Sequence, residues 1–249
     1  MKPERYDEIK EKYAQLNLAV VGDFCLDRYL EINPNLKEKS IETGLPVNNV
    51  SNIRAQPGGA GTVAANLGKL GVGNIEAIGF CGDDGEGFEL KRALKNISGI
   101  NLSNFFCFEH RNTFTYCKPL VITGNKHREL SRLDTKNWTP TPCNLSHRLA
   151  HAVKSLHRNI DAVIVLEQTD KPETGVVTEA VRHELKALSI EREKIPIIVD
   201  SRDSLRKYPP LSYKMNETEL KSFFDKDKDM DIKTIQVATS ELAVQHGKP

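Results

Sequence analysis

Short apolar runs alternate with amphipathic segments along most of the chain. Each run has the length of a buried strand, and the segments between them space their apolar residues as a helix does. The predicted strands lie at 18–22, 74–80, 161–166, 195–200 and 211–215. The predicted helices lie at 4–16, 60–71, 88–94, 144–157 and 173–188, with another opening at 216 and a final strand and helix in 234–246. This alternation predicts a doubly wound, mostly parallel α/β sheet.

Two segments depart from the alternation. Residues 29–54 are polar and alternate only weakly, and residues 105–133 contain several aromatic side chains and a turn signal at Gly124 and Asn125. Short strands joined by turns are typical of both patterns. We predict that the two segments pair outside the main sheet and form a flap.

A glycine-rich turn precedes the helix predicted at 60–71. Gly58, Gly59 and Gly61 fall within four residues of one another, and Gly71 supplies a helix-ending signal. Glycine lets the backbone approach a neighbour closely, and the first N–H groups of a helix have no partner within it. The turn therefore suits either contact with a ligand or close packing of the helix, and the stretch alone leaves both open.

The composition indicates which classes of protein are compatible with this sequence. The 249 residues suit one large α/β domain, and 39% hydrophobic with 28% charged residues is typical of a soluble globular protein. A net charge of +1 gives no reason to expect nucleic acid or an anionic membrane as partner. The 5 cysteines are scattered without a paired motif, which favours reduced thiols. With no apolar run of membrane-spanning length, a cytoplasmic location is the expectation.

Several polar residues follow the predicted strands. Asp23, Asp27 and Arg28 come after the first strand, and Asp200 and Arg202 lie at the end of the fourth. Ligands of open α/β sheets gather beyond the carboxyl ends of the strands, so these acids are candidates for holding polar groups. A turn-forming Asp23 and a solvated Asp27 are the alternative.

Two further patterns favour a structural interpretation. The acidic, glycine-rich segment 82–87 lacks the lysine of a phosphate-binding loop, and we interpret it as a strand-to-helix turn. Cys143, His147 and His151 have a spacing compatible with zinc, but an amphipathic helix accounts for them equally well.

These residues, taken in order, resemble the PfkB (ribokinase-like) family of carbohydrate kinases, and within it the heptose-phosphate kinase branch. The matching motifs run from residue 18 to about residue 224. They are Gly22-Asp23 with Asp27-Arg28-Tyr29, Pro57-Gly58-Gly59-Ala60, Val63-Ala64-Ala65-Asn66-Leu67, Gly82-x-Asp84-x-x-Gly87, Arg132-Leu133-Asp134, Asp200 and Asn216-x-x-Glu219.

The resemblance implies a ribokinase-like core with a small β lid and ATP-dependent phosphorylation of a sugar or sugar-phosphate hydroxyl. It implies that Asp27 binds sugar hydroxyls and that Gly58 and Gly59 bring backbone close to the sugar and hinge the lid. Arg132 is expected near the substrate. Asn216 and Glu219 are expected to organise Mg²⁺, through water, and the ATP phosphates. Two copies are expected to pair through their lids.

The sequence also departs from the family pattern. Thr62 occupies a sugar-contacting position where the family usually has Asn, and residues 167–170 replace an Asp-Tyr-x-Lys-Gly segment of the heptose branch. The Gly-Ala-Gly-Asp motif, whose Asp is the family's catalytic base, does not occur. We therefore expect a C-terminally incomplete domain that is inactive alone. A non-catalytic sugar-binding or regulatory homologue is the alternative. A nucleotide-dependent oxidoreductase is disfavoured because no G-x-G-x-x-G follows the first strand.

Overall fold

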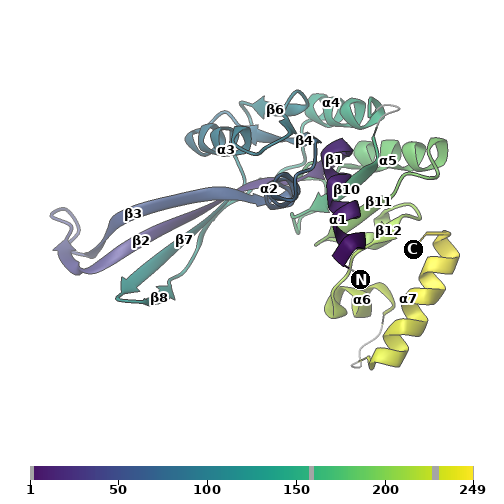
Figure 1. The fold of residues 1–249 in the computed structure, drawn as a ribbon. Helices are drawn as coiled ribbons and strands as arrows, with labels where there is room; N and C mark the ends of the chain where they lie inside the picture. The colour runs from purple at the N-terminus through teal and green to yellow at the C-terminus, as the bar shows by residue number, and fades with distance from the viewer. Residues whose placement is uncertain (1–2, 157–159, 226–229, 249) are drawn as a thin grey trace.

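The chain forms two β-sheets, one packed between helices and one projecting from it as a long arm (Figure 1). The computed structural model describes residues 3–156, 160–225 and 230–248. The main sheet has the order β12-β11-β10-β1-β4-β5, and β6 also pairs with β4. Its strands are β1 (Asn17–Gly22), β4 (Asn74–Gly82), β5 (Ile100–Asn101), β6 (Phe105–Phe108), β10 (Ala162–Glu167), β11 (Ile197–Ser201) and β12 (Ser212–Tyr213).

All neighbouring strands of the main sheet run parallel, which confirms the predicted α/β class. Each of the four long apolar runs forms one of its strands. The helices are α1 (Pro3–Glu11), α2 (Ala60–Leu70), α3 (Gly85–Lys95), α4 (Cys143–Lys154), α5 (Glu179–Glu191), α6 (Glu217–Phe223) and α7 (Ile232–His246), with short 3₁₀ turns η1 (Tyr13–Gln15) and η2 (Leu205–Lys207).

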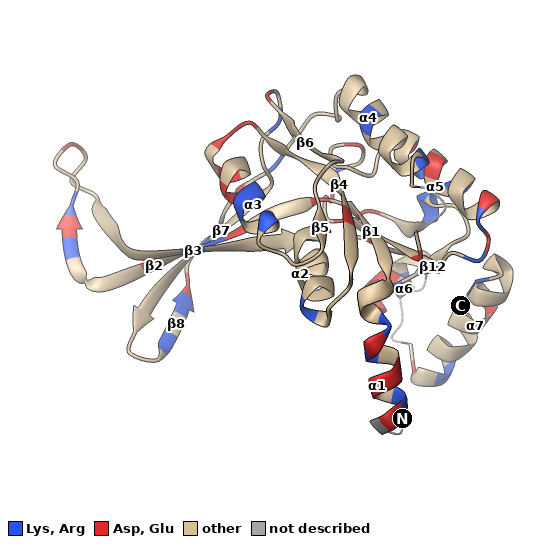
Figure 2. Cartoon of the chain, turned by 45° about the horizontal axis from the view of Figure 1, so that its top comes forward, with Lys and Arg blue, Asp and Glu red and all other residues tan. Residues whose placement is uncertain are grey.

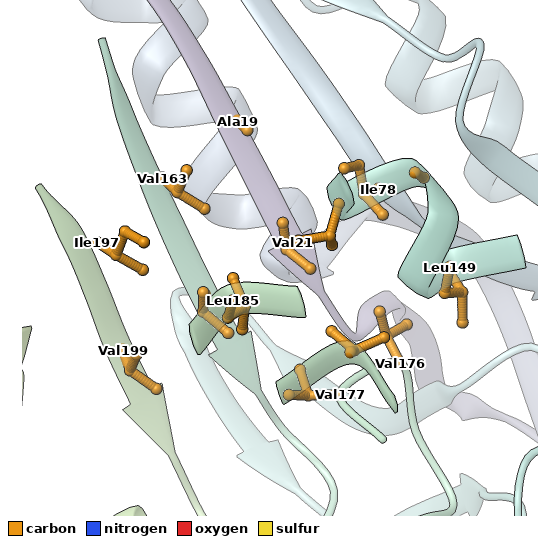
Figure 3. Close-up of a cluster of buried hydrophobic side chains, with 14 of the residues drawn as sticks. Ala19, Val21, Ile78, Leu149, Val163, Val176, Val177, Leu185, Ile197 and Val199 are labelled. Carbon is orange, nitrogen blue, oxygen red and sulfur yellow. The ribbon is translucent and has the colours of Figure 1, made fainter. Parts of the chain in front are cut away.

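Two apolar cores lie on opposite faces of the main sheet, because successive side chains of a strand point to opposite faces. On one face, α4 and α5 contribute Leu149 and Leu185 to a cluster with alternate residues of the strands (Figure 3). On the other face, Ala64 of α2 and Leu90 of α3 pack on the intervening residues. Burial on both faces explains the continuous apolar runs of β1 and β4, whereas β10 and β11 are fully buried on one face only. The strand residues of the first cluster include Ala19, Val21, Ile78, Val163, Val165, Ile197 and Val199.

The second sheet, which we call the projecting sheet, has the order β3-β2-β7-β8, with β9 also paired to β7. Its strands are β2 (Phe24–Lys39), β3 (Pro46–Gly59), β7 (Thr115–Thr123), β8 (Lys126–Glu129) and β9 (Leu133–Thr135). β2 and β7 pair in parallel and the remaining pairs are antiparallel. This mixed sheet matches the predicted flap, but β2 begins at Phe24 and β3 extends to Gly59, so the arm is longer than the segment 29–54.

Three sequence-based element assignments were wrong. Phe105–Phe108 is β6 and pairs with β4 in the main sheet, where the Phe105 ring meets Phe24 edge-on at 5.2 Å. The helix predicted from 173 begins at Glu179, because residues 168–178 form a loop. The strand predicted within 234–246 does not form, since α7 runs unbroken from Ile232 to His246.

The charged N-terminal segment forms a helix on the surface of the protein. α1 carries acidic and basic side chains along its length (Figure 2), as expected of a surface helix. No helix in the described part of the chain is both long and apolar enough to cross a membrane.

Asp23 connects the main sheet to the segments on either side of it. Its side chain is completely buried. The carboxylate accepts hydrogen bonds from the backbone N–H groups of Gln168 (2.7 Å) and Thr169 (3.1 Å) on one oxygen and from Val176 (2.7 Å) on the other. The Asp23 carbonyl accepts the N–H of Ala60, the first residue of α2. Asp23 is therefore a structural anchor with its carboxylate engaged, and the prediction that it holds polar ligand groups was wrong.

The Asp23 pKa reflects this environment. Burial raises the pKa of the carboxyl above its usual value, and the three N–H donors oppose that rise.

The segment 82–87 is the strand-to-helix turn that the sequence predicts. Asp84 is the N-cap of α3, and its side chain accepts the Gly87 N–H at 2.7 Å.

Replacing Leu185 tests the core. Leu185→Ala removes a completely buried side chain of α5, and we expect a loss of about 2–5 kcal/mol in the free energy of unfolding. Ile190→Ala in the same helix is the control, since Ile190 is 70% exposed, and should cost less than about 1 kcal/mol. Urea denaturation measures both. Equal losses would contradict the packing described for α5.

Replacing Asp23 tests the anchor. An Asn side chain has one acceptor oxygen and an NH₂ group that would face an N–H donor, so Asp23→Asn leaves buried amides unpaired. We expect a loss of about 3 kcal/mol in the free energy of unfolding. Asp161→Asn is the matched control, because the exposed Asp161 carboxylate also accepts a backbone N–H, that of Asn17 at 2.8 Å. The control should change stability by less than about 1 kcal/mol.

Candidate active site

The glycine turn lies where the two sheets meet. In the β2–β3 pairing, Gly58 faces Cys25 and Gly59 faces Phe24. Gly59 has φ of 56°, and a Cβ there would lie 2.4 Å from the Asp23 carbonyl oxygen. A Cβ at Gly58 would lie 2.8 Å from Oδ2 of Asp27. Gly59 thus allows the close backbone approach that brings α2 up to Asp23, whereas a Cβ at Gly58 would displace the Asp27 carboxylate.

A polar cavity of about 340 Å³ opens beside this turn. Residues of the projecting sheet and of the loops after β10 and β11 contribute to its wall. It brings together three of the residues predicted from the sequence, Asp27, Gly59 and Arg132. The full lining is Asp27, Gly59, Tyr116, Lys118, Arg132, Lys136, Gln168, Asp170 and Arg202.

Cationic side chains outnumber carboxylates in this lining. Lys118 Nζ lies 2.9 Å from Oδ1 of Asp27, and Lys136 Nζ lies 3.4 Å from Oδ1 of Asp170. Arg132 is held by Asp134 at 2.8 Å and lies over the Tyr116 ring. Since four lining residues are cationic and two are acidic, the cavity suits a ligand that is polar and negatively charged.

The Asp27–Lys118 pair is mostly shielded from solvent, with side chains 18% and 19% exposed. Partial burial lowers the pKa of Lys118, but hydrogen bonding and attraction from Asp27 outweigh it and raise that pKa overall. Lys118 is therefore charged at neutral pH.

Other residues named from the sequence lie outside the cavity. Gly58 is not part of the lining, and Thr62, in the first turn of α2, is exposed and donates to the Pro57 carbonyl at 3.1 Å. Asp200 pairs with Lys214 at 3.0 Å.

Asn216 and Glu219 form the capping box that begins α6. The Asn216 side chain accepts the Glu219 N–H at 2.9 Å, and the Glu219 carboxylate accepts the Asn216 N–H at 2.8 Å. Glu219 also lines a second cavity, of about 320 Å³, between η2 and α6. Among the residues that the structure describes, no group of three or more His, Cys, Asp or Glu could hold a metal ion directly. This pair therefore fits Mg²⁺ only through water, on the carboxylate oxygen that the capping box leaves free.

The cysteine and histidine pattern on α4 is better explained by helix amphipathicity. Cys143 Sγ lies 3.7 Å from Nε2 of His147, while Leu145, Leu149 and Val153 face the core. His157, the last residue of the helix predicted at 144–157, lies outside the described residues. Cys25, Cys81, Cys107, Cys117 and Cys143 all have free thiols, as predicted.

Sequence reasoning missed several lining residues. Tyr116 and Lys118 occupy alternate positions of β7 and so share one face of the projecting sheet. Their spacing of two residues indicates that they share one face of a strand, but the family motifs lie in the segments before and after β7 and do not include them. Gln168 reaches the cavity because its backbone is bound to Asp23, which no local pattern predicts.

Glu167 is the last residue of β10 and directly precedes the lining residue Gln168. It is 2% exposed, and its carboxylate accepts hydrogen bonds from the hydroxyl groups of Ser201 and Tyr208, the latter at 2.9 Å. Burial raises the Glu167 pKa to about 7 despite these bonds, and the charges of Asp23 and Asp203 add to the rise. The Glu167 carbonyl accepts the N–H of Arg202, so the residue also supports a lining position.

Glu167 makes stability depend on pH. Its folded pKa of about 7 exceeds the ordinary 4.5, so between these values the folded protein keeps a proton that the unfolded chain releases. Stability contributed by this proton is complete below pH 4.5 and is lost as pH rises through 7, by up to about 3 kcal/mol. We expect Glu167→Gln to flatten this decline in urea denaturation at pH 5 to 8. Parallel profiles for both proteins would contradict the assignment.

Comparison with curated proteins gives relatives that are longer than this chain. The chain is 30% identical over 243 residues to Bifunctional protein HldE of Magnetococcus marinus, which covers 94% of the chain and 46% of the relative. It is 32% identical over 183 residues to Bifunctional protein HldE of Gluconobacter oxydans, covering 74% of the chain and 36% of the relative. The chain thus spans about half or less of these relatives. No protein-family model matches it.

Solved structures share the fold at low sequence identity. Phosphofructokinase-2 from Escherichia coli, in complex with fructose-6-phosphate, aligns with a TM-score of 0.66 and 14% identity over 94% of this chain and 71% of that one. Arabidopsis thaliana ribokinase, complexed with ribose and ATP, aligns with a TM-score of 0.58 and 18% identity over 92% and 69%. These likenesses establish the ribokinase-like fold, and the HldE relatives add similarity in sequence. The chain therefore has the ribokinase-like fold of these sugar kinases and is similar in sequence to part of the HldE proteins.

Proposed function

We propose that residues 1–249 form the sugar-binding part of an ATP-dependent kinase that phosphorylates a hydroxyl of a sugar or sugar phosphate. The observation that supports this most directly is the polar cavity at the carboxyl edge of the main sheet, where Asp27 and the Gly59 backbone meet. A carboxylate with free acceptor positions is suited to sugar hydroxyls, which are hydrogen-bond donors. The cavity also lies where open α/β sheets bind their ligands.

The charge of the cavity favours a substrate that already carries a phosphate group. Arg132, Lys136 and Arg202 line it together with Lys118, and Arg and Lys side chains bind phosphate oxygens through charge-assisted hydrogen bonds. The fructose-6-phosphate complex of Escherichia coli phosphofructokinase-2 is consistent with such a substrate class on this fold.

The projecting sheet is proposed to act as the lid over this cavity and as the contact between two copies of the chain. It carries much of the exposed apolar surface, which supports pairing of like surfaces. The exposed apolar residues on and next to its long hairpin are Leu36, Ile41, Leu45, Val47, Val50 and Ile53.

ATP and Mg²⁺ are the proposed cofactors. Mg-ATP would supply the phosphoryl group and neutralise its charge, which is the main requirement of phosphoryl transfer. Glu219 would contribute through water, at the cavity between η2 and α6. The printed sequence contains no Gly-Ala-Gly-Asp segment, so binding is the decisive measurement for this chain.

Calorimetry with mannose 6-phosphate, fructose 6-phosphate, sedoheptulose 7-phosphate and their unphosphorylated parents tests the proposal. We expect at least one sugar phosphate to bind about tenfold or more tightly than its parent, because the phosphate meets the cationic lining. Asp27→Asn should weaken that binding by about tenfold or more, since hydroxyl donors lose a charged acceptor. Asp170→Asn is the matched control within the cavity and should have a smaller effect, because the Asp170 side chain is 58% exposed.

A wild-type chain that binds none of these ligands would contradict the proposal. Titration with Mg-ATP separates a kinase from a non-catalytic sugar-binding homologue. Affinity for both ligands supports the kinase, and sugar-phosphate affinity without ATP affinity supports the homologue.

A further inference from the structure

We propose that Lys118 determines specificity: together with Asp27 it forms a paired donor and acceptor that recognises two neighbouring oxygens of the sugar. The proposal rests on the proposed function, because it assigns a role within the same cavity. It adds a residue that neither the motifs nor the candidate sugar-binding residues identified from the sequence include.

The pairing of β2 with β7 creates the couple. Their parallel register sets Asp27 beside Tyr116 and Tyr29 beside Lys118. From that position the Lys118 side chain reaches back along the sheet, and Nζ donates to Asp27 Oδ1 at 2.9 Å. The Tyr29 ring lies 5.0 Å from Nζ and supports the cation from one side.

The couple retains hydrogen-bonding capacity toward the cavity. An ammonium group has three protons, and Lys118 uses one on Asp27, with the Tyr29 hydroxyl at the longer distance of 3.5 Å. At least one proton is left for a ligand. The Asp27 carboxylate has about four acceptor positions, and in the described residues Lys118 is the group that donates to it. Both residues line the cavity.

This arrangement recognises two adjacent oxygens of the sugar rather than a single hydroxyl. One sugar hydroxyl donates to the carboxylate, while the adjacent oxygen accepts from the ammonium. A sugar that lacks either oxygen leaves a shielded charge without its ligand partner, which carries a large penalty. Asp27 alone would accept from any hydroxyl within reach and would discriminate less.

A simpler role for Lys118 is to add positive charge for a phosphate group. Lys136 provides the comparison, because it lines the same cavity and pairs with a carboxylate, Asp170, that the proposal leaves without a role. Loss of positive charge alone should weaken the binding of every phosphorylated ligand by the same factor. Loss of the couple should change the ratio of the affinities for a sugar phosphate and its deoxy analogue.

The experiment measures binding of mannose 6-phosphate and its 2-, 3- and 4-deoxy analogues by calorimetry, or of fructose 6-phosphate and its monodeoxy analogues if that sugar binds more tightly. Wild type, Lys118→Met and Lys136→Met are compared. We expect wild type to bind each analogue that lacks an oxygen of the recognised pair about tenfold or more weakly than the parent. For the analogue that lacks the oxygen accepting from Lys118, Lys118→Met should bind analogue and parent within about twofold of each other, whereas Lys136→Met should keep the wild-type ratio.

Retention of the wild-type ratio by Lys118→Met would overturn the inference while leaving the proposed function intact. Absence of binding by wild type to every sugar phosphate would overturn both. If Lys118→Met does not fold, Lys118→Arg decides: it keeps the charge but places its donors in a planar fork, so it should bind the parent sugar phosphate and show an altered ratio. An unaltered ratio in that variant would also overturn the inference.

Discussion

The buried carboxylate of Asp23 is the constraint on which the rest of the structure depends. It occupies the point where β1 ends, and three backbone N–H groups of the loop after β10 converge on it. Its carbonyl receives the first N–H of α2. One residue therefore fixes the end of the central strand, the loop that carries Gln168, and the glycine turn. Two parts of the cavity lining, the glycine turn and the loop that carries Gln168, are thus placed by this shared anchor.

Much of the fold could be predicted because it is encoded locally. The apolar runs predicted the parallel strands, and the glycine turn before α2 predicted a close backbone approach. Phe105–Phe108 was misplaced because an aromatic run near a turn is equally compatible with a flap and with a main-sheet strand. Only pairing with β4 and the contact with Phe24 decide between them, and both are distant in sequence.

The candidate site was predictable in part for the same reason. Asp27, Gly59 and Arg132 belong to recognisable motifs, and the structure brings them to one cavity. Lys118 and Lys136 lie outside the motifs, and Arg202 was noted only for its place after a predicted strand, so their convergence depends on sheet register and loop anchoring. Asp23 shows the reverse case: its position after a strand suggested ligand binding, but its depth makes it a structural acceptor.

The length of β2 has a mechanical consequence. The strand runs for 16 residues from the junction of the two sheets, a span of roughly 50 Å at the usual rise per residue. A rotation of about 5° at its base would move the far end by roughly 4 Å over that span, whereas Asp27, close to the pivot, would move by a fraction of an ångström. A displacement at the tip of the arm therefore reaches the cavity-lining residues near its base as a much smaller displacement.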